Sequence, residues 1–81
     1  MLILAIFLNV LGYPVLYLIE KMEDKNPQIR KRSLQAFATL REVIPDNLID
    51  SVEHMVVERT SDKNSDVKTQ ASWTLQGLRG L

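Results

Sequence analysis

The 81-residue sequence has no cysteine and one histidine, and only 6% of its residues are aromatic. Without cysteine the chain has no disulfide, no cysteine-ligated zinc site and no thiolate nucleophile, so apolar packing must hold the fold together. Ten basic and ten acidic residues give a net charge of zero, unlike the strongly basic composition of a general nucleic-acid binder. The sequence also lacks a glycine-rich phosphate loop and zinc-ligand spacing. We therefore expect no cofactor, no metal and no enzymatic activity.

Glycine and proline are scarce, at three residues each, while 46% of the chain is hydrophobic. A chain rich in aliphatic residues and poor in turn-forming residues is typical of an all-α domain. Apolar residues recur at intervals of three and four and do not alternate with polar residues at every second position, so the pattern predicts helices and no strands. This length accommodates one small domain.

Charge is absent from residues 1–19, so all twenty charged side chains lie in the remaining sixty-two positions. Nineteen uncharged residues approach the roughly 20 that a helix needs to cross a bilayer, which leaves a membrane-associated protein as one interpretation. The stretch lacks the basic start and the cleavage site of a signal peptide, and Gly12 and Pro14 interrupt it. Because glycine suits a helix end and proline the first turn of the next helix, we expect two short buried helices and a cytoplasmic protein.

The rest of the chain divides into four amphipathic segments, which with a helix over residues 1–12 make about five helices. Asn26 and Pro27 are a good cap and first helical residue, because the asparagine oxygen accepts an orphan amide and proline has none to lose. Pro45 is expected to end that helix, and Asp46 and Ser65 to cap the next two. The predicted helices cover residues 14–22, 27–44, 47–59 and 66–78.

Each of these helices carries one apolar stripe, which the helical period directs inward. The polar residues between are expected to face solvent. The expected inward residues are Leu16, Ile19, Met22, Ile29, Ser33, Ala36, Phe37, Leu40, Val43 or Ile44, Leu48, Val52, Met55, Val56, Val67, Ala71, Thr74, Leu75 and Leu78.

The sequence contains an internal repeat. A shift of 38 positions aligns DKNPQIRKRSLQAFATL, residues 24–40, with DKNSDVKTQASWTLQGL, residues 62–78. Inward positions stay small or apolar, as where Phe37 aligns with Leu75, whereas outward positions vary, as where Gln35 aligns with Trp73. A period near 40 residues made of two helices indicates a helical solenoid.

The first copy, with the pattern Asp-x-x-Pro-x-Ile-Arg after an apolar helix, resembles the HEAT repeat. The second copy resembles it less closely, with Ser65 at the proline position and Lys68 at the arginine position. The resemblance implies antiparallel helix pairs stacked into a curved array whose second helices line the inner surface. It also implies that Arg30 pairs with a loop aspartate, Asp24 or Asp62. It says little about function, because such repeats occur in transport receptors, scaffolds, chromosome-organising complexes and a few enzymes.

We therefore predict a single helical-repeat domain, divided into an apolar N-terminal helix (1–12), a first repeat (13–44) and a second repeat (45–81). Two repeats are fewer than the three or so that a solenoid usually needs, because each unit buries its apolar face only against a neighbour. Residues 1–11 are expected to cover one end. The other end is expected to meet another subunit or a further part of a longer array.

Lys31, Arg32, Gln35, Lys68 and Trp73 are the candidate partner-binding residues, because they lie outside the apolar stripes of the two helices expected at the inner surface. Tryptophan is enriched among residues that dominate binding energy. Trp73 is equally consistent with packing on the preceding helix as part of a terminal cap. The lone His54 is expected to be an exposed residue on an acidic helix face.

These observations favour a non-catalytic protein interaction or scaffold module. Membrane association through residues 1–19, and binding of a nucleic-acid backbone through Arg30, Lys31 and Arg32, are alternatives. Self-association is also open, because residues 20–45 carry six basic and four acidic side chains while residues 46–81 carry four and six. In such a stack Lys31 and Arg32 of one copy would face Asp50, Glu53 or Glu58 of the next.

Overall fold

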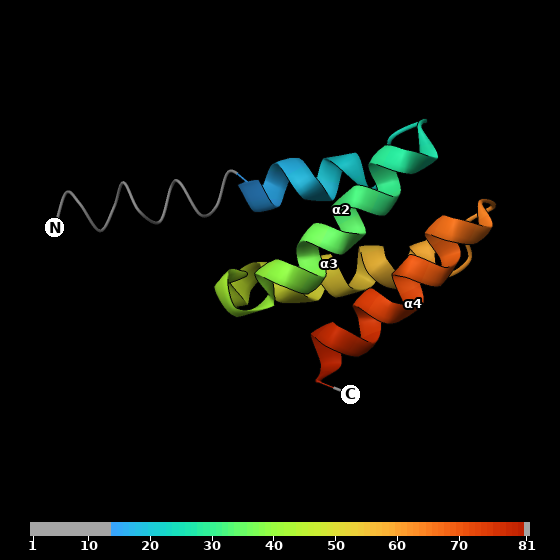
Figure 1. Cartoon of the computed structure of the whole chain (residues 1–81). Coiled ribbons are helices and arrows are strands. Elements are labelled where there is room, and N and C mark those ends of the chain that lie inside the picture. Colours follow the sequence, from blue (N-terminus) through green and yellow to red (C-terminus); the bar gives the residue numbers. More distant parts are fainter. Residues whose placement is uncertain (1–13, 81) are drawn as a thin grey trace, which may run out of the picture.

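The computed structural model describes residues 14–80, in which all regular structure is helical. A first helix comprises residues 14–21, α2 spans Pro27–Leu40, α3 spans Asp46–Arg59 and α4 spans Ser65–Arg79, with a short 3-10 helix, η1, over Arg41–Val43 (Figure 1). The predicted all-α fold is confirmed for this part of the chain. The helix predicted over residues 1–12 lies outside the described residues, as does Leu81.

Two equivalent capping motifs start α2 and α4. Asn26 Oδ1 accepts from the amide of Gln28 at 2.9 Å, and Asn64 Oδ1 accepts from the amide of Asp66 at 3.0 Å. The aspartate two residues before each asparagine accepts from that asparagine's own amide, at 2.8 Å in the first copy and 2.9 Å in the second. The repeated Asp-Lys-Asn sequence therefore forms the same local structure twice, each time satisfying amides that a helix N-terminus leaves unpaired.

The predicted caps of the last two helices are wrong by one residue. Asn64 caps α4, and Ser65 is already its first helical residue. Pro45 precedes α3 without a side-chain cap, and Asp46 lies in the first turn, where the helix dipole favours its negative charge. The helix before Pro45 also ends earlier than predicted, at Leu40, because η1 follows it and the residue before proline is held in extended geometry.

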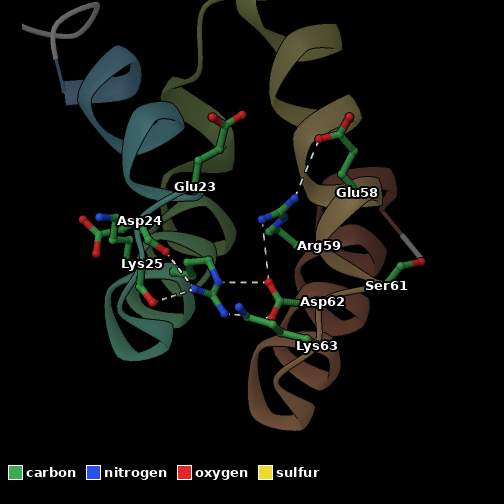
Figure 2. A pocket seen from close by; sticks show the side chains of 9 residues that line it. Glu23, Asp24, Lys25, Glu58, Arg59, Ser61, Asp62 and Lys63 are labelled. Atoms are coloured by element: carbon green, nitrogen blue, oxygen red, sulfur yellow. Dashed lines mark hydrogen bonds and ion pairs between the residues drawn. The ribbon is translucent and has the colours of Figure 1, made fainter.

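Contacts at both helix ends show that α2 and α4 run parallel. Near the start of α2, Arg30 binds Asp62 in the loop that leads into α4 (Figure 2). Just after the end of α2, Arg41 Nε donates to the carbonyl of Leu78 near the end of α4, at 3.1 Å. The first helix and α3 also end side by side, since Arg59 Nη1 donates to the carbonyl of Met22 at 3.4 Å. Two antiparallel helix pairs therefore lie beside each other.

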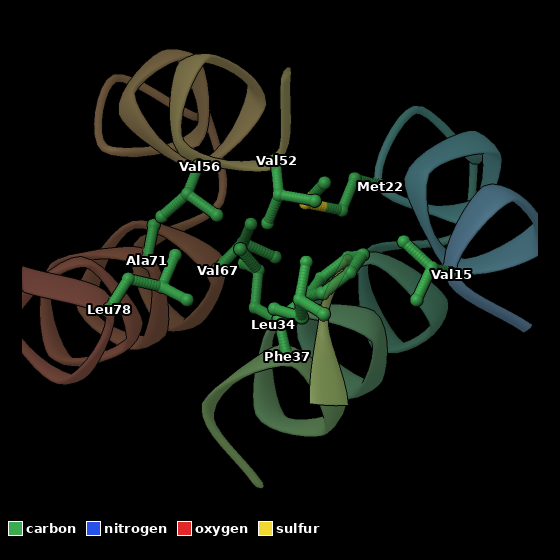
Figure 3. Packing of buried hydrophobic residues seen from close by; sticks show 10 residues of the cluster. Val15, Met22, Leu34, Phe37, Val52, Val56, Val67, Ala71 and Leu78 are labelled. Atoms are coloured by element: carbon green, nitrogen blue, oxygen red, sulfur yellow. The ribbon is translucent and has the colours of Figure 1, made fainter. Parts of the chain in front are cut away.

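One apolar core is shared by all four helices (Figure 3). Phe37 and Leu34 of α2 are fully buried between the two pairs, and Leu75 of α4 packs partly buried against the same cluster. Leu34 was not among the expected inward residues, although the α2 face that meets α4 needs it. The buried apolar residues are Val15, Met22, Leu34, Phe37, Ile44, Val52, Val56, Val67, Ala71 and Leu78.

The expected orientation of the first helix is partly wrong. Leu16 is 52% exposed, whereas Val15 is buried at 2%. Val15 and Met22 are seven residues apart and so lie on one helix face, with Leu18 and Ile19 beside it. This face packs on the shared core, and Leu16 lies on the face that turns away from it.

The end of α4 is set by a glycine in the left-handed conformation. Gly80 has φ 72°, and its amide donates to the carbonyls of Gln76 and Gly77. Side chains other than glycine rarely adopt this conformation, so Gly80 ends the helix at little strain. Gly77 lies within the helix.

Candidate functional site

The ion pair of Arg30 and Asp62 joins the two helix pairs. It is the most buried ion pair among residues 14–80. Arg30 Nε and Nη2 each lie 2.9 Å from one carboxylate oxygen of Asp62, which makes the pair bidentate. Both side chains are almost fully buried, at 6% and 3% exposure. The prediction that Arg30 pairs with a loop aspartate is confirmed, and Asp62 is that aspartate.

Arg30 also fastens the loop that leads into its own helix. Its Nη1 donates to the backbone carbonyls of Asp24 at 2.7 Å and Lys25 at 3.1 Å. One guanidinium therefore satisfies two carbonyls of the first loop and a carboxylate of the second. A lysine offers a single nitrogen and has no planar fork to match this geometry.

Burial alone raises the pKa of the Asp62 carboxyl. Hydrogen bonds from Arg30 and from the Asn64 amide, together with the positive charges of Arg30 and Arg59, outweigh burial and lower the pKa below its ordinary value. Arg59 Nη1 lies 3.7 Å from Asp62 Oδ2. The carboxylate is thus held ionised in the folded protein.

An open cleft of about 630 Å³ surrounds this ion pair, between the two loops (Figure 2). Its charges balance, because Glu23, Asp24, Glu58 and Asp62 face Lys25, Arg30, Arg59 and Lys63. Its most buried charges, Arg30 and Asp62, already satisfy each other. This loop cleft lies where the helix pairs join, and its four acidic and four basic side chains give it no excess of either charge for a ligand.

The described residues assemble no catalytic constellation. His54 is exposed on α3, with Nε2 3.3 Å from Glu58 Oε1, and no third group orients it. Across residues 14–80 no group of three or more potential metal ligands comes together. His54 thus lies where the sequence suggested, on the polar face of α3.

Three of the five predicted binding residues lie along one surface. Thr74 Oγ1 of α4 donates to the carbonyl of Leu34 of α2 at 2.8 Å, which marks the line of closest contact between the helices. Lys31 and Ala38 flank Leu34 on the solvent side of α2, and Gln35 lies one step further out. Along α4, Gly77 lies three positions after Thr74, Trp73 lies four positions before Gly77, and Asp66 lies seven positions, about two turns, before Trp73, so these residues extend the same surface. We call this surface the α2–α4 strip; it comprises Lys31, Gln35, Ala38, Asp66, Trp73 and Gly77.

Trp73 is the most exposed large apolar side chain among residues 14–80, at 63%. At this exposure the neighbouring helices leave most of the indole uncovered. Gly77 follows it by four residues on the same helix face, and a Cβ at Gly77 would meet nothing within 4 Å. The indole therefore borders open space on a helix that is otherwise packed against two neighbours.

The other two predicted residues lie elsewhere. Arg32 is exposed on α2 but on the side remote from α4, and Lys68 is exposed on the opposite flank of α4, toward α3. That flank also carries Arg79, whose Nε donates to Glu53 of α3 at 2.9 Å. Lys68 and Trp73 therefore do not share a binding surface.

The structure also buries one of the polar residues that were expected to face solvent. Gln70 is 8% exposed, and its Nε2 donates to Thr74 Oγ1 at 3.2 Å. Gln70 lies four residues before Thr74, so the helix turns it into the same contact with α2. Asp66 and Gly77 were missed because neither residue type signals binding on its own.

The basic cluster at residues 30–32 is divided by the helix. Arg30 is buried in its ion pair, and only Lys31 and Arg32 reach solvent.

No helix within the described part of the chain has the length and apolar character needed to span a membrane. Residues 14–19, the last part of the uncharged stretch, place Val15 in the shared core.

Comparisons with known proteins add no assignment, since no protein family, curated protein or solved structure matches the chain.

Proposed function

We propose that this chain is a non-catalytic, cytoplasmic protein-binding module built as a HEAT-like helical solenoid, with the α2–α4 strip as its binding surface. Two antiparallel helix pairs with parallel second helices support the architecture, as does the buried Arg30–Asp62 pair between them. The capping motif that recurs after 38 residues supports the repeat. In such an array the second helices α2 and α4 form one continuous surface.

The exposure of Trp73 is the observation that carries the binding proposal. An indole left 63% in water retains a large apolar area that a partner can bury. Tryptophan anchors commonly contribute more than about 2 kcal/mol to an interface. The small residues Ala38 and Gly77 leave room beside it for a partner's side chains.

Polar side chains at the sides of the strip supply a rim. Lys31 lies on the α2 side and Asp66 on the α4 side, and Gln35, further out on α2, offers both a donor and an acceptor. Rim residues of this kind set orientation and exclude competing partners more than they add affinity. The partner that fits best carries an apolar anchor for the indole and an acidic group opposite Lys31.

The test is a double substitution, Trp73→Ala with Lys31→Ala, in the full chain. We expect loss of partner capture by at least about 30-fold, since a hot-spot residue is worth roughly 2 kcal/mol. Helicity by circular dichroism is expected to stay unchanged, because both side chains lie outside the core. Binding is measured by affinity capture with quantitative mass spectrometry, followed by titration of the recovered partner.

Lys68→Ala is the matched control, because it removes an exposed lysine from the other flank of α4. It is expected to leave binding as it is. Partner capture that survives the double substitution, or that depends on Lys68 instead, would defeat the assignment of the strip.

A further inference from the structure

The 38-residue shift that relates the two repeats also relates the two ends of the molecule. Arg30 corresponds to Lys68, and Asp62 corresponds to Asp24. Lys68 is exposed on α4, and no carboxylate of residues 14–80 forms an ion pair with it. Asp24 is part-exposed, and Lys21 Nζ lies 3.9 Å away. One end thus carries an exposed cation, Lys68, where the joint has Arg30, and the other carries a part-exposed carboxylate, Asp24, where the joint has Asp62.

Apolar residues at the two ends follow the same relation. At the joint, Ile19 of the first helix and Met55 of α3 line one shallow cavity. Ile19 corresponds to Val57, which is 41% exposed, and Met55 corresponds to Tyr17, which is 59% exposed. Leu75, the counterpart of the fully buried Phe37, is only partly buried. Each end therefore exposes apolar groups at positions that are covered in the joint.

We propose that the α3–α4 end of one molecule binds the first-helix end of a second copy, the end that residues 1–11 were expected to cover, with Lys68 of one copy against Asp24 of the next. Val57 and Leu75 would then pack against Tyr17 of the second copy, as Ile19 and Phe37 pack across the joint. The contact is heterologous and open-ended, so it extends a stack rather than closing a symmetric dimer. It lies away from the α2–α4 strip and leaves Trp73 free.

The contact between copies is weaker than the joint inside one molecule. Leu34 corresponds to Ser72 and Thr74 to Ala36, so the buried leucine and the hydroxyl bond to its carbonyl have no counterpart. Lys68 also replaces the arginine fork with a single nitrogen. We therefore expect association at high micromolar concentration, on the order of 100 µM or above.

The experiment is a charge-swap cycle on the full chain, followed by sedimentation equilibrium over roughly 10 µM to 1 mM. The wild type is expected to grow in mass with concentration and to dissociate at high salt. Lys68→Asp and Asp24→Lys each place like charges across the contact and are expected to weaken association by about fivefold to tenfold. Mixing the two variants restores association, because each copy then meets an opposite charge at both ends.

Asp24→Asn separates folding from charge, because it keeps the side-chain oxygen that accepts from the Asn26 amide. It is expected to weaken association while keeping full helicity. Lys31→Asp makes the same change of charge on the α2–α4 strip and is expected to leave the mass distribution unchanged. A wild type that stays monomeric throughout, or a mixture that associates no better than either variant, overturns the proposal without touching the one for the strip.

Discussion

At the scale of single residues, the buried ion pair of Arg30 and Asp62 connects the two helix pairs. They are 32 positions apart in sequence and almost fully buried together, so each leaves an uncompensated buried charge if the other is removed. The carboxylate also caps the backbone of the loop that starts α4. This pair therefore couples the start of one helix to the start of another.

The lowered pKa of Asp62 makes stability dependent on pH in a defined direction. The unfolded carboxyl titrates near the ordinary value of about 4 and binds protons more readily than the folded one, so stability rises with pH through this range. The contribution of Asp62 is complete above about pH 5 and is lost as the pH falls through the folded pKa. Urea unfolding at a series of pH values from 7 to about 2.5 measures this contribution, because the range spans the titration of the carboxyl in the unfolded protein and its fall in the folded one.

Asp62→Asn is the comparison for that titration, because it has no proton to bind. We expect the variant to be less stable than the wild type at pH 7 and the difference to shrink in acid. A difference that stays constant across the whole range would show that Asp62 is not held ionised by its neighbours.

Two glycines of α4 lead to opposite predictions for the same substitution. A Cβ at Gly77 meets nothing within 4 Å, so Gly77→Ala is expected to stabilise the protein by about 0.5 to 1 kcal/mol through the entropy of the unfolded chain. Gly80 has φ 72°, so Gly80→Ala is expected to destabilise it by about 1 kcal/mol. Thermal unfolding of both variants and the wild type measures the two changes in stability. Equal changes for the two variants would contradict this description of α4.

At the scale of elements, asparagine caps fix the starts of α2 and α4, and arginine contacts join the ends of neighbouring helices. The N-cap oxygen of Asn64 accepts from the amides of Asp66 and Val67. Asn64→Ala is therefore expected to cost about 1 kcal/mol. Ser65→Ala is expected to change stability by less than about 0.5 kcal/mol, because Ser65 is exposed inside the first turn.

Chemical denaturation of these two variants tests the assignment of the cap. A large loss in Ser65→Ala, with none in Asn64→Ala, would return the cap to the residue that the sequence pattern first indicated.

Sequence reasoning located the helices because their apolar residues recur at the helical period, and it identified the repeat because both copies keep the same inward pattern. It placed Leu16 toward the core and Gln70 toward solvent, because the sequence does not define where the edges of an apolar stripe lie. Which edge is covered depends on where the neighbouring helix lies, as the bond from Thr74 to the Leu34 carbonyl shows for Gln70. Asparagine and serine both suit an N-cap, and Asn64 and Ser65 are adjacent. Only the backbone conformation distinguishes which of the two caps α4, so the sequence left the choice ambiguous.

The candidate site was harder to predict than the fold. Composition and spacing favoured Lys31, Gln35 and Trp73, which the structure does bring to one surface. They also favoured Lys68, which the rotation of α4 places on the far flank. A helix of 15 residues turns several times, so residues five apart in sequence need not share a face.

At the scale of the whole molecule, the central claim is that two antiparallel helix pairs lie side by side around one interior. The most direct measurement of it is a double-mutant cycle on Arg30→Ala and Asp62→Ala by urea unfolding at neutral pH. Each single change is expected to cost about 3 kcal/mol, and the double variant little more than either one, which gives a coupling energy of about 2 kcal/mol or more. Strictly additive losses would show that the starts of α2 and α4 do not meet, and would contradict the arrangement.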